Sequence, residues 1–181
     1  KYEPSDVVVT LGGFIFGPAA ALVITILKAF LEMVTVSDTG IIGCVMNIVQ
    51  TLSFAFIASL IYKQKHSIQG ALIGLFTAFA VSVGVMILWN YLITPLYMGV
   101  PREEVAKMLL PVFLPFNLIK GGLNLGFTFL LYKPVVTALR KGNIIPPVQE
   151  SGRKLHVGII IMAFLVIITC VMVALMLNHV I

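Results

Sequence analysis

The chain has 181 residues, of which 60% are hydrophobic and only 10% are charged, and its mean hydropathy is +1.09. A soluble domain keeps about a quarter of its residues charged, so the composition excludes an ordinary cytosolic enzyme, a disordered protein and a disulfide-rich scaffold. It predicts an all-α fold, a polytopic bundle of transmembrane helices. The formal net charge is +5, but the basic residues form short clusters between apolar runs, where they orient membrane helices, so we expect no nucleic-acid partner.

The first apolar stretch, residues 7–34, is too long for one comfortable membrane helix and is interrupted by the sequence GGFIFGP. A helix that crosses the lipid needs about 20 mostly apolar residues, and a Gly-Pro step favours a turn. We therefore predict two short helices, over residues 5–16 and 18–33. Pro18 then takes the first helical position, where its missing N–H costs nothing.

Four further apolar runs follow, at residues 40–62, 68–96, 103–132 and 157–177. The last of them comes after the polar sequence GNIIPPVQESGRK. With the two short helices, they make six predicted membrane segments. We divide the chain accordingly. Residues 1–141 form a membrane bundle, residues 142–156 a cytoplasmic linker, and residues 157–181 contain an additional C-terminal transmembrane helix.

Charge is distributed unequally between the two ends of these segments. Seven of the 12 Lys and Arg residues fall at two junctions, after residue 62 and on either side of the linker, which alternating topology places on the same side. The positive-inside rule makes that side cytoplasmic. The opposite, outer side carries six of the seven acidic residues, Glu3, Asp6, Glu32, Asp38, Glu103 and Glu104.

Polar side chains at membrane depth are costly and usually face the bundle interior. Asn117, Lys120 and Asn124 share one face of a predicted helix, while Trp89 and Asn90 lie near the outer end of the preceding one. An ammonium group there must be paired, hydrated or neutralised. We predict that these residues line a ligand cavity; the alternative is that the asparagines only join helices by hydrogen bonds and that Lys120 reaches an interface.

Other polar positions have simpler interpretations. Asn47 and Gln50 lie three residues apart and either extend the same cavity or hold helices together. Lys28 and Glu32 have the spacing of a helical ion pair, which we favour over ligand contact. The aromatic residues around Trp89 are typical of an interfacial belt, although a flat conjugated ligand would stack on the same rings.

Small residues and cysteines give weaker signals. Gly-x-x-x-Gly patterns begin at Gly13, Gly70 and Gly122, and such patterns let helices approach closely in lipid. Cys44 and Cys170 lie inside apolar runs and match no metal-ligand or disulfide spacing, so we interpret them as core residues. The sequence predicts no metal site.

Catalytic and nucleotide-binding motifs are absent from the sequence. It contains no G-x-x-x-x-G-K-[ST] loop, no H-E-x-x-H and no G-x-S-x-G, and His66, His156 and His179 are isolated from one another. Energy for any transport must therefore come from a gradient or from another subunit. An enzyme is the least expected function class, because no nucleophile and base form a workable arrangement.

Several segments together resemble the riboflavin-specific S components of energy-coupling factor (ECF) transporters, over residues 1–141. The element SDVVVTLGGFIFGP resembles a motif of vitamin S components in general, and TGIIGCVMN follows it in the expected order. The segments WNYLITPLYMGVPRE and PFNLIKGG are more specific to the riboflavin group. These two segments also contain most of the polar residues assigned above to a cavity.

The resemblance implies a riboflavin-binding subunit of an ATP-driven importer, multi-pass in a bacterial cell membrane, which binds the vitamin from outside without changing it chemically. It implies a membrane scaffold subunit and two ATPase subunits as partners, and no cofactor. In this family the residues matching Asn90, Asn117 and Lys120 contact riboflavin. We add Trp89, Asn124 and Asn47 to the expected substrate-binding set.

The sequence also departs from the family in places. The family's first helix is missing from this chain, residues 157–177 form a helix beyond the usual set, and Cys44 stands where the family tends to have an acidic residue. Three alternatives stay open: an S component for another flavin or vitamin, a self-sufficient secondary carrier in which Lys120 couples proton movement to substrate, and a purely structural membrane subunit.

Overall fold

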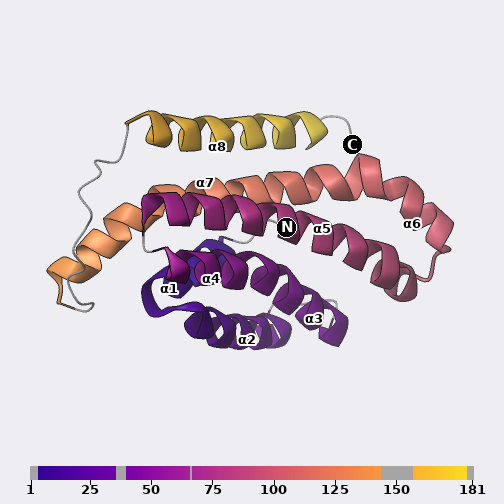
Figure 1. Ribbon diagram of the computed structural model, residues 1–181. Helices are drawn as coiled ribbons and strands as arrows, with labels where there is room; N and C mark the ends of the chain where they lie inside the picture. Colours follow the sequence, from indigo (N-terminus) through magenta and orange to yellow (C-terminus); the bar gives the residue numbers. More distant parts are fainter. Residues whose placement is uncertain (1–3, 36–39, 66, 144–156, 179–181) are drawn as a thin grey trace.

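The computed structural model describes residues 4–35, 40–65, 67–143 and 157–178, and the regular structure in these ranges is helical throughout (Figure 1). The all-α prediction is confirmed, and each of the six predicted segments is helical. In chain order the elements are α1 (Ser5–Phe16), α2 (Pro18–Thr35), α3 (Gly40–Thr51), η1 (Leu52–Phe56), α4 (Ile57–Gln64), α5 (Ile68–Met98), α6 (Arg102–Met108), η2 (Leu109–Phe113), α7 (Leu114–Lys141) and α8 (Val157–Asn178).

The predicted turn between the first two helices is confirmed. Gly17 has a φ of +94°, a conformation that glycine adopts without steric cost, and its N–H donates to the carbonyl oxygen of Gly13 at 2.9 Å. Pro18 is the first residue of α2, the helical position where proline is favoured. The chain therefore reverses here, and α2 returns alongside α1.

Four helical stretches of the described chain are long and apolar enough to cross a membrane: Pro18–Thr35, Gly40–Gln64, Gln69–Met98 and Arg102–Leu139. Two of them combine α-helices with one turn of π-helix, η1 in the second and η2 in the fourth. The remaining apolar helical runs, Ser5–Phe16 and Ala163–Val173, are shorter. The chain is a multi-pass membrane protein.

The apolar core lies where α1, α4, α5 and α7 meet. Phe14, Phe54, Leu75, Leu125 and Phe129 form a single buried cluster with residues of these helices. By contrast, α2 and α8 leave large apolar side chains exposed along most of their length. Exposed apolar helix faces of this extent are expected for a bundle whose solvent is lipid.

Helix α8 lies along α7 (Figure 1). A Cβ atom added at Gly122 would lie 2.7 Å from Cys170 Sγ, and one added at Gly126 would lie 2.7 Å from Ile167 Cγ1. Both distances are too short for a side chain, so the Gly-x-x-x-Gly pattern of α7 is what allows α8 to approach. The assignment of α8 to a separate C-terminal region is still a prediction.

The charged ends of the helices are separated in space. The junction of α4 and α5 and the end of α7 lie at the left of Figure 1, whereas the α5–α6 connection lies at the right. Lys63 lies in the last turn of α4 and Lys141 is the last residue of α7, whereas Glu103 lies in the first turn of α6. This separation agrees with the basic and acidic sides inferred from the sequence. Which side faces the cytoplasm stays a prediction.

Candidate functional site

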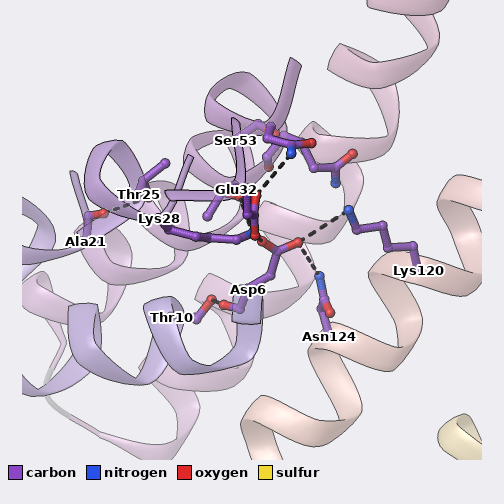
Figure 2. Close-up of polar contacts among 12 residues, drawn as sticks. Asp6, Thr10, Ala21, Thr25, Lys28, Glu32, Ser53, Lys120 and Asn124 are labelled. Carbon is purple, nitrogen blue, oxygen red and sulfur yellow. Dashed lines mark hydrogen bonds and ion pairs between the residues drawn. The ribbon is translucent and has the colours of Figure 1, made fainter. Parts of the chain in front are cut away.

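Asp6, in the first turn of α1, is the centre of a buried polar network (Figure 2). Its side chain is 1% exposed. One carboxylate oxygen, Oδ1, accepts hydrogen bonds from Lys28 Nζ at 2.6 Å and from Thr51 Oγ1 at 2.7 Å. The other, Oδ2, accepts from Asn124 Nδ2 at 3.3 Å and lies 3.5 Å from Lys120 Nζ. Residues of α1, α2, α3 and α7 thus meet at one carboxylate.

The turn at Gly17 explains why Asp6 and Lys28 meet. They lie the same number of residues before and after Gly17, so the antiparallel packing of α1 and α2 brings them to the same height. Two nearby threonine hydroxyls donate hydrogen bonds to backbone carbonyl oxygens of their own helices. Thr10 Oγ1 donates to Asp6 at 2.7 Å, and Thr25 Oγ1 donates to Ala21 at 2.7 Å. Neither threonine uses the Asp6 carboxylate, whose contacts described above are with other helices.

The network continues along α2 into α3. Lys28 Nζ also lies 3.4 Å from Glu32 Oε1, and Glu32 Oε2 accepts a hydrogen bond from Asn47 Nδ2 at 3.0 Å. The ion pair predicted between Lys28 and Glu32 is confirmed. We call the connected set the Asp6 cluster; it consists of Asp6, Lys28, Glu32, Asn47, Thr51, Lys120 and Asn124.

Among the described residues, the Asp6 cluster contains ionised groups of both signs. Asp6 and Glu32 contribute two negative charges, and Lys28 and Lys120 contribute two positive charges. Burying a charge in an apolar environment is very costly unless it is paired and hydrogen-bonded. The pairing therefore explains how Lys120, whose side chain is 9% exposed, is accommodated inside a membrane bundle.

The predicted polar face of α7 is buried, with Asn117, Lys120 and Asn124 all largely inaccessible. Asn117 Nδ2 donates to the Phe113 carbonyl oxygen at 2.7 Å, in the π-helical turn η2. Among the described residues, two buried side-chain oxygens on this helix have no hydrogen-bond partner, Asn124 Oδ1 and Thr128 Oγ1. A buried acceptor without a donor costs about 1–3 kcal/mol, and a ligand that supplies an N–H or O–H would remove that cost.

The predicted residues of α5 are less closely connected to the cluster. Asn90 is buried, but its Nδ2 donates to the Met86 carbonyl oxygen at 2.8 Å and its Oδ1 accepts from Thr94 Oγ1 at 3.0 Å. Both bonds stay within α5. Trp89 is half-buried. The structure thus joins Lys120, Asn124 and Asn47 into one network, and places Asn90 and Trp89 on a helix that packs against α7.

Asp6 is the principal residue that the sequence analysis missed, because we assigned it only to the acidic outer side. The predicted helix over residues 5–16 already included Asp6, and the structure adds that its side chain is buried. The sequence did contain a signal for this contact. Asp6 precedes an apolar run, and Lys28 lies as many residues after the turn at Gly17 as Asp6 lies before it. Thr51 carried no comparable signal, because threonine is common in membrane helices and usually bonds to its own helix.

The arrangement is suited to binding a ligand. It offers lysine and asparagine donors, an unpartnered amide oxygen and charges of both signs. In the part of the chain that the structure describes, no group of three His, Cys, Asp or Glu residues could hold a metal ion. Cys44 is buried, and its Sγ lies 3.6 Å from the carbonyl oxygen of Ala29.

Comparisons with known proteins agree on one family. A sequence model described as "ECF transporter, substrate-specific component" matches residues 1–132. Riboflavin transporter RibU of Staphylococcus aureus (strain TCH60) is 31% identical over 144 residues, 76% of this chain and 75% of that protein. Riboflavin transporter FmnP of Bacillus subtilis (strain 168) is 26% identical over 156 residues, 80% of this chain and 82% of that protein.

A solved structure gives the same result for the fold. The structure reported as "Structure and mechanism of the S component of a bacterial ECF transporter" superimposes with a TM-score of 0.63 at 30% sequence identity. The alignment covers 76% of this chain and 78% of that one.

Proposed function

This chain belongs to the family of substrate-specific components of ECF transporters, and we propose that the Asp6 cluster is where it binds riboflavin. It is a riboflavin-specific, multi-pass subunit of a bacterial vitamin importer, and it binds its substrate without chemical change. The family is one of transporter components, so the chain is not an enzyme.

The observation that carries the proposed site is the meeting of Lys120, Asn124 and Asp6 inside the bundle. The ring of riboflavin is flat and uncharged, with carbonyl oxygens that accept hydrogen bonds and an imide N–H that donates one. A lysine ammonium has three N–H donors, so Lys120 has donors beyond the one directed at Asp6. The free Oδ1 of Asn124 is an acceptor for the imide or for a ribityl hydroxyl.

Trp89, Asn90 and Asn117 complete the proposed site. An aromatic face at Trp89 would stack on the flavin ring, and the amides of Asn90 and Asn117 would exchange bonds to their own helices for bonds to the ligand. Asn47 is the outlying member, because it bonds to Glu32 and reaches Asp6 only through Lys28. We therefore expect a smaller effect on binding from Asn47 than from Lys120.

The import of riboflavin by this family depends on an ECF scaffold and ATPase subunits, and we propose two ATPase subunits and one membrane scaffold as partners. This assignment agrees with the lack of a G-x-x-x-x-G-K-[ST] loop in the sequence. The subunit supplies recognition, and its partners supply the energy of ATP hydrolysis.

Uptake of radiolabelled riboflavin tests this function in cells that lack their own riboflavin carrier. The chain is expressed alone, with an ECF scaffold and its ATPases, or with the same module carrying inactive ATPases. We expect uptake only with the active module. Equal uptake by the chain alone would contradict the proposal and favour the secondary-carrier alternative, in which Lys120 couples proton movement to transport.

A further inference from the structure

Helix α7 is held from three sides at one level of the bundle. Lys120 faces α1, where its Nζ lies 3.5 Å from the Asp6 carboxylate. A Cβ atom added at Gly121 would lie 2.6 Å from a side chain of α5, and one added at Gly122 would lie 2.7 Å from Cys170 Sγ of α8. With about 3.6 residues per turn, successive residues of an α-helix point about 100° apart. The three neighbouring helices therefore surround the α7 backbone.

Helix α8 supplies the support on the side opposite the polar face of α7. Gly122 comes two residues after Lys120, and two residues correspond to about 200° around an α-helix. Gly126 likewise comes two residues after Asn124. At Gly126 even the backbone of α8 is close, since an added Cβ would lie 3.4 Å from the carbonyl oxygen of Ala163, a residue of the apolar core. Helix α8 is therefore packed behind the two residues of α7 that contact Asp6.

The contacts between Asp6 and α7 are the longer ones of its carboxylate. Those of Oδ1, with Lys28 of α2 and Thr51 of α3, are 2.6 and 2.7 Å long. Those of Oδ2 with α7 are 3.3 Å, to Asn124, and 3.5 Å, to Lys120. The carboxylate is thus fixed closely to α2 and α3, and the position of α7 relative to it depends on the packing against the other faces of α7.

We propose that α8 is a positioning element of the binding site: it holds α7 at the distance from Asp6 at which Lys120 and Asn124 bind riboflavin. The proposal rests on the proposed function and extends it to a helix outside residues 1–132, the part matched by the family model. N–H···O hydrogen bonds are about 2.7–3.2 Å long, so a shift of α7 by a fraction of an ångström changes the bonds that it offers. A displaced α8 then lowers the affinity for riboflavin without any change at the polar face.

A disulfide between the two helices tests this within one polypeptide. In a Cys44→Ala background, Gly122→Cys places a Cβ atom 2.7 Å from Cys170 Sγ, and one S–S bond of about 2.05 Å can bridge that separation. In the reduced protein the two sulfur atoms must move apart, which displaces α8 from α7. Fluorescence titration of the purified full chain should give a riboflavin dissociation constant about tenfold higher after reduction with a phosphine than after oxidation.

A complementary change on α8 gives a second test that needs no disulfide. Gly126→Ala introduces a Cβ atom 2.7 Å from Ile167 Cγ1 and should weaken riboflavin binding. Combining it with Ile167→Ala makes space for the added methyl group and should restore most of the affinity. Gly84→Ala is the control on α5, since a Cβ there meets nothing within 4 Å, and it should leave the affinity unchanged.

Each titration gives the number of binding sites as well as the dissociation constant, and these two quantities separate folding from positioning. A variant that partly unfolds loses sites, whereas a folded variant with a displaced α7 keeps its sites and binds more weakly. A dissociation constant that rises in reduced Gly122→Cys and in Gly126→Ala, and falls again on oxidation and in the double variant, supports the proposal.

Two results would overturn the proposal. One is an unchanged dissociation constant in both reduced Gly122→Cys and Gly126→Ala, which would leave α8 without influence on the site. The other is a Gly122→Cys protein that does not cross-link to Cys170, which would show that α8 does not lie behind the polar face. A wild-type chain that binds no riboflavin would instead contradict the proposed function, so the two failures are distinguishable.

Discussion

At the scale of single residues, the Asp6 cluster offsets the cost of removing two lysine side chains from water. Lys120 and Lys28 each need a counter-ion in an apolar bundle, and both find it in Asp6. Removing one member of a buried ion pair leaves an uncompensated charge, which is more damaging than removing both members. The charged residues of the cluster should therefore behave as a unit in mutational experiments.

The first prediction concerns the free acceptor of Asn124. Asn124→Leu should weaken riboflavin binding about tenfold, because a hydrogen bond to a buried group contributes roughly 1–2 kcal/mol. Fluorescence titration measures the effect. Thr128→Val is the matched control, since Thr128 Oγ1 is likewise buried without a partner in the described chain but is not assigned to the ligand. Equal loss of affinity in both variants would show that general packing, and not Asn124, is responsible.

The second prediction is a stability cycle at Asp6 and Lys28. Lys28→Met should lower the free energy of unfolding by about 3 kcal/mol, because it removes the shorter ion pair of a buried carboxylate. The loss caused by Asp6→Asn should be smaller in the Lys28→Met background than in the wild type, because only Lys120 then loses its counter-ion. Denaturant unfolding in detergent gives the four values. Losses that simply add would show that the two residues are not coupled.

At the scale of helices, hydropathy located the segments well because lipid imposes one simple requirement, a long apolar run. It did not reveal η1 and η2, since a π-helical turn changes the hydrogen-bond register without changing the apolar character of the side chains. Pro111 was a local signal for η2, because proline cannot donate the backbone bond of a regular helix. The segment LSFAF of η1 offers no such signal.

The third prediction concerns the contact between α7 and α8. Gly126→Val should displace α8, because the first added atom already meets Ile167 at 2.7 Å, and overpacking of this kind costs about 1–3 kcal/mol. Maleimide labelling of Cys170, in a Cys44→Ala background, should become faster as the helices separate. Gly84→Ala is the control, since a Cβ there meets nothing within 4 Å. Unchanged labelling in Gly126→Val would contradict the packing described.

At the scale of the whole molecule, the sequence predicted some members of the Asp6 cluster and missed Asp6 itself. Lys120 and Asn124 were found because helical periodicity places them on one face of a single helix. Their contact with Asp6 joins residues more than a hundred positions apart, 118 in the case of Asn124. Such a contact depends on which helices are neighbours, and hydropathy does not contain that information.

The fourth prediction concerns orientation in the membrane. Lys65 follows α4 and Glu103 lies in the first turn of α6, and both are exposed. The α4–α5 junction and α6 lie at opposite ends of the bundle (Figure 1). In a chain with Cys44→Ala and Cys170→Ala, a cysteine at position 65 should be labelled by an impermeant maleimide only after the cells are opened, and one at position 103 should be labelled in intact cells. The reverse pattern would show that the positive-inside assignment is wrong.

The most direct measurement is a riboflavin titration of the purified, ligand-free chain beside a Lys120→Met variant, with thiamine as competitor. We predict saturable quenching that thiamine does not reverse, and an affinity at least about tenfold weaker in the variant, since hydrogen bonds from charged donors contribute roughly 1.5–3 kcal/mol. No quenching by a folded wild-type chain, or equal affinities in the two proteins, would contradict riboflavin binding at the Asp6 cluster.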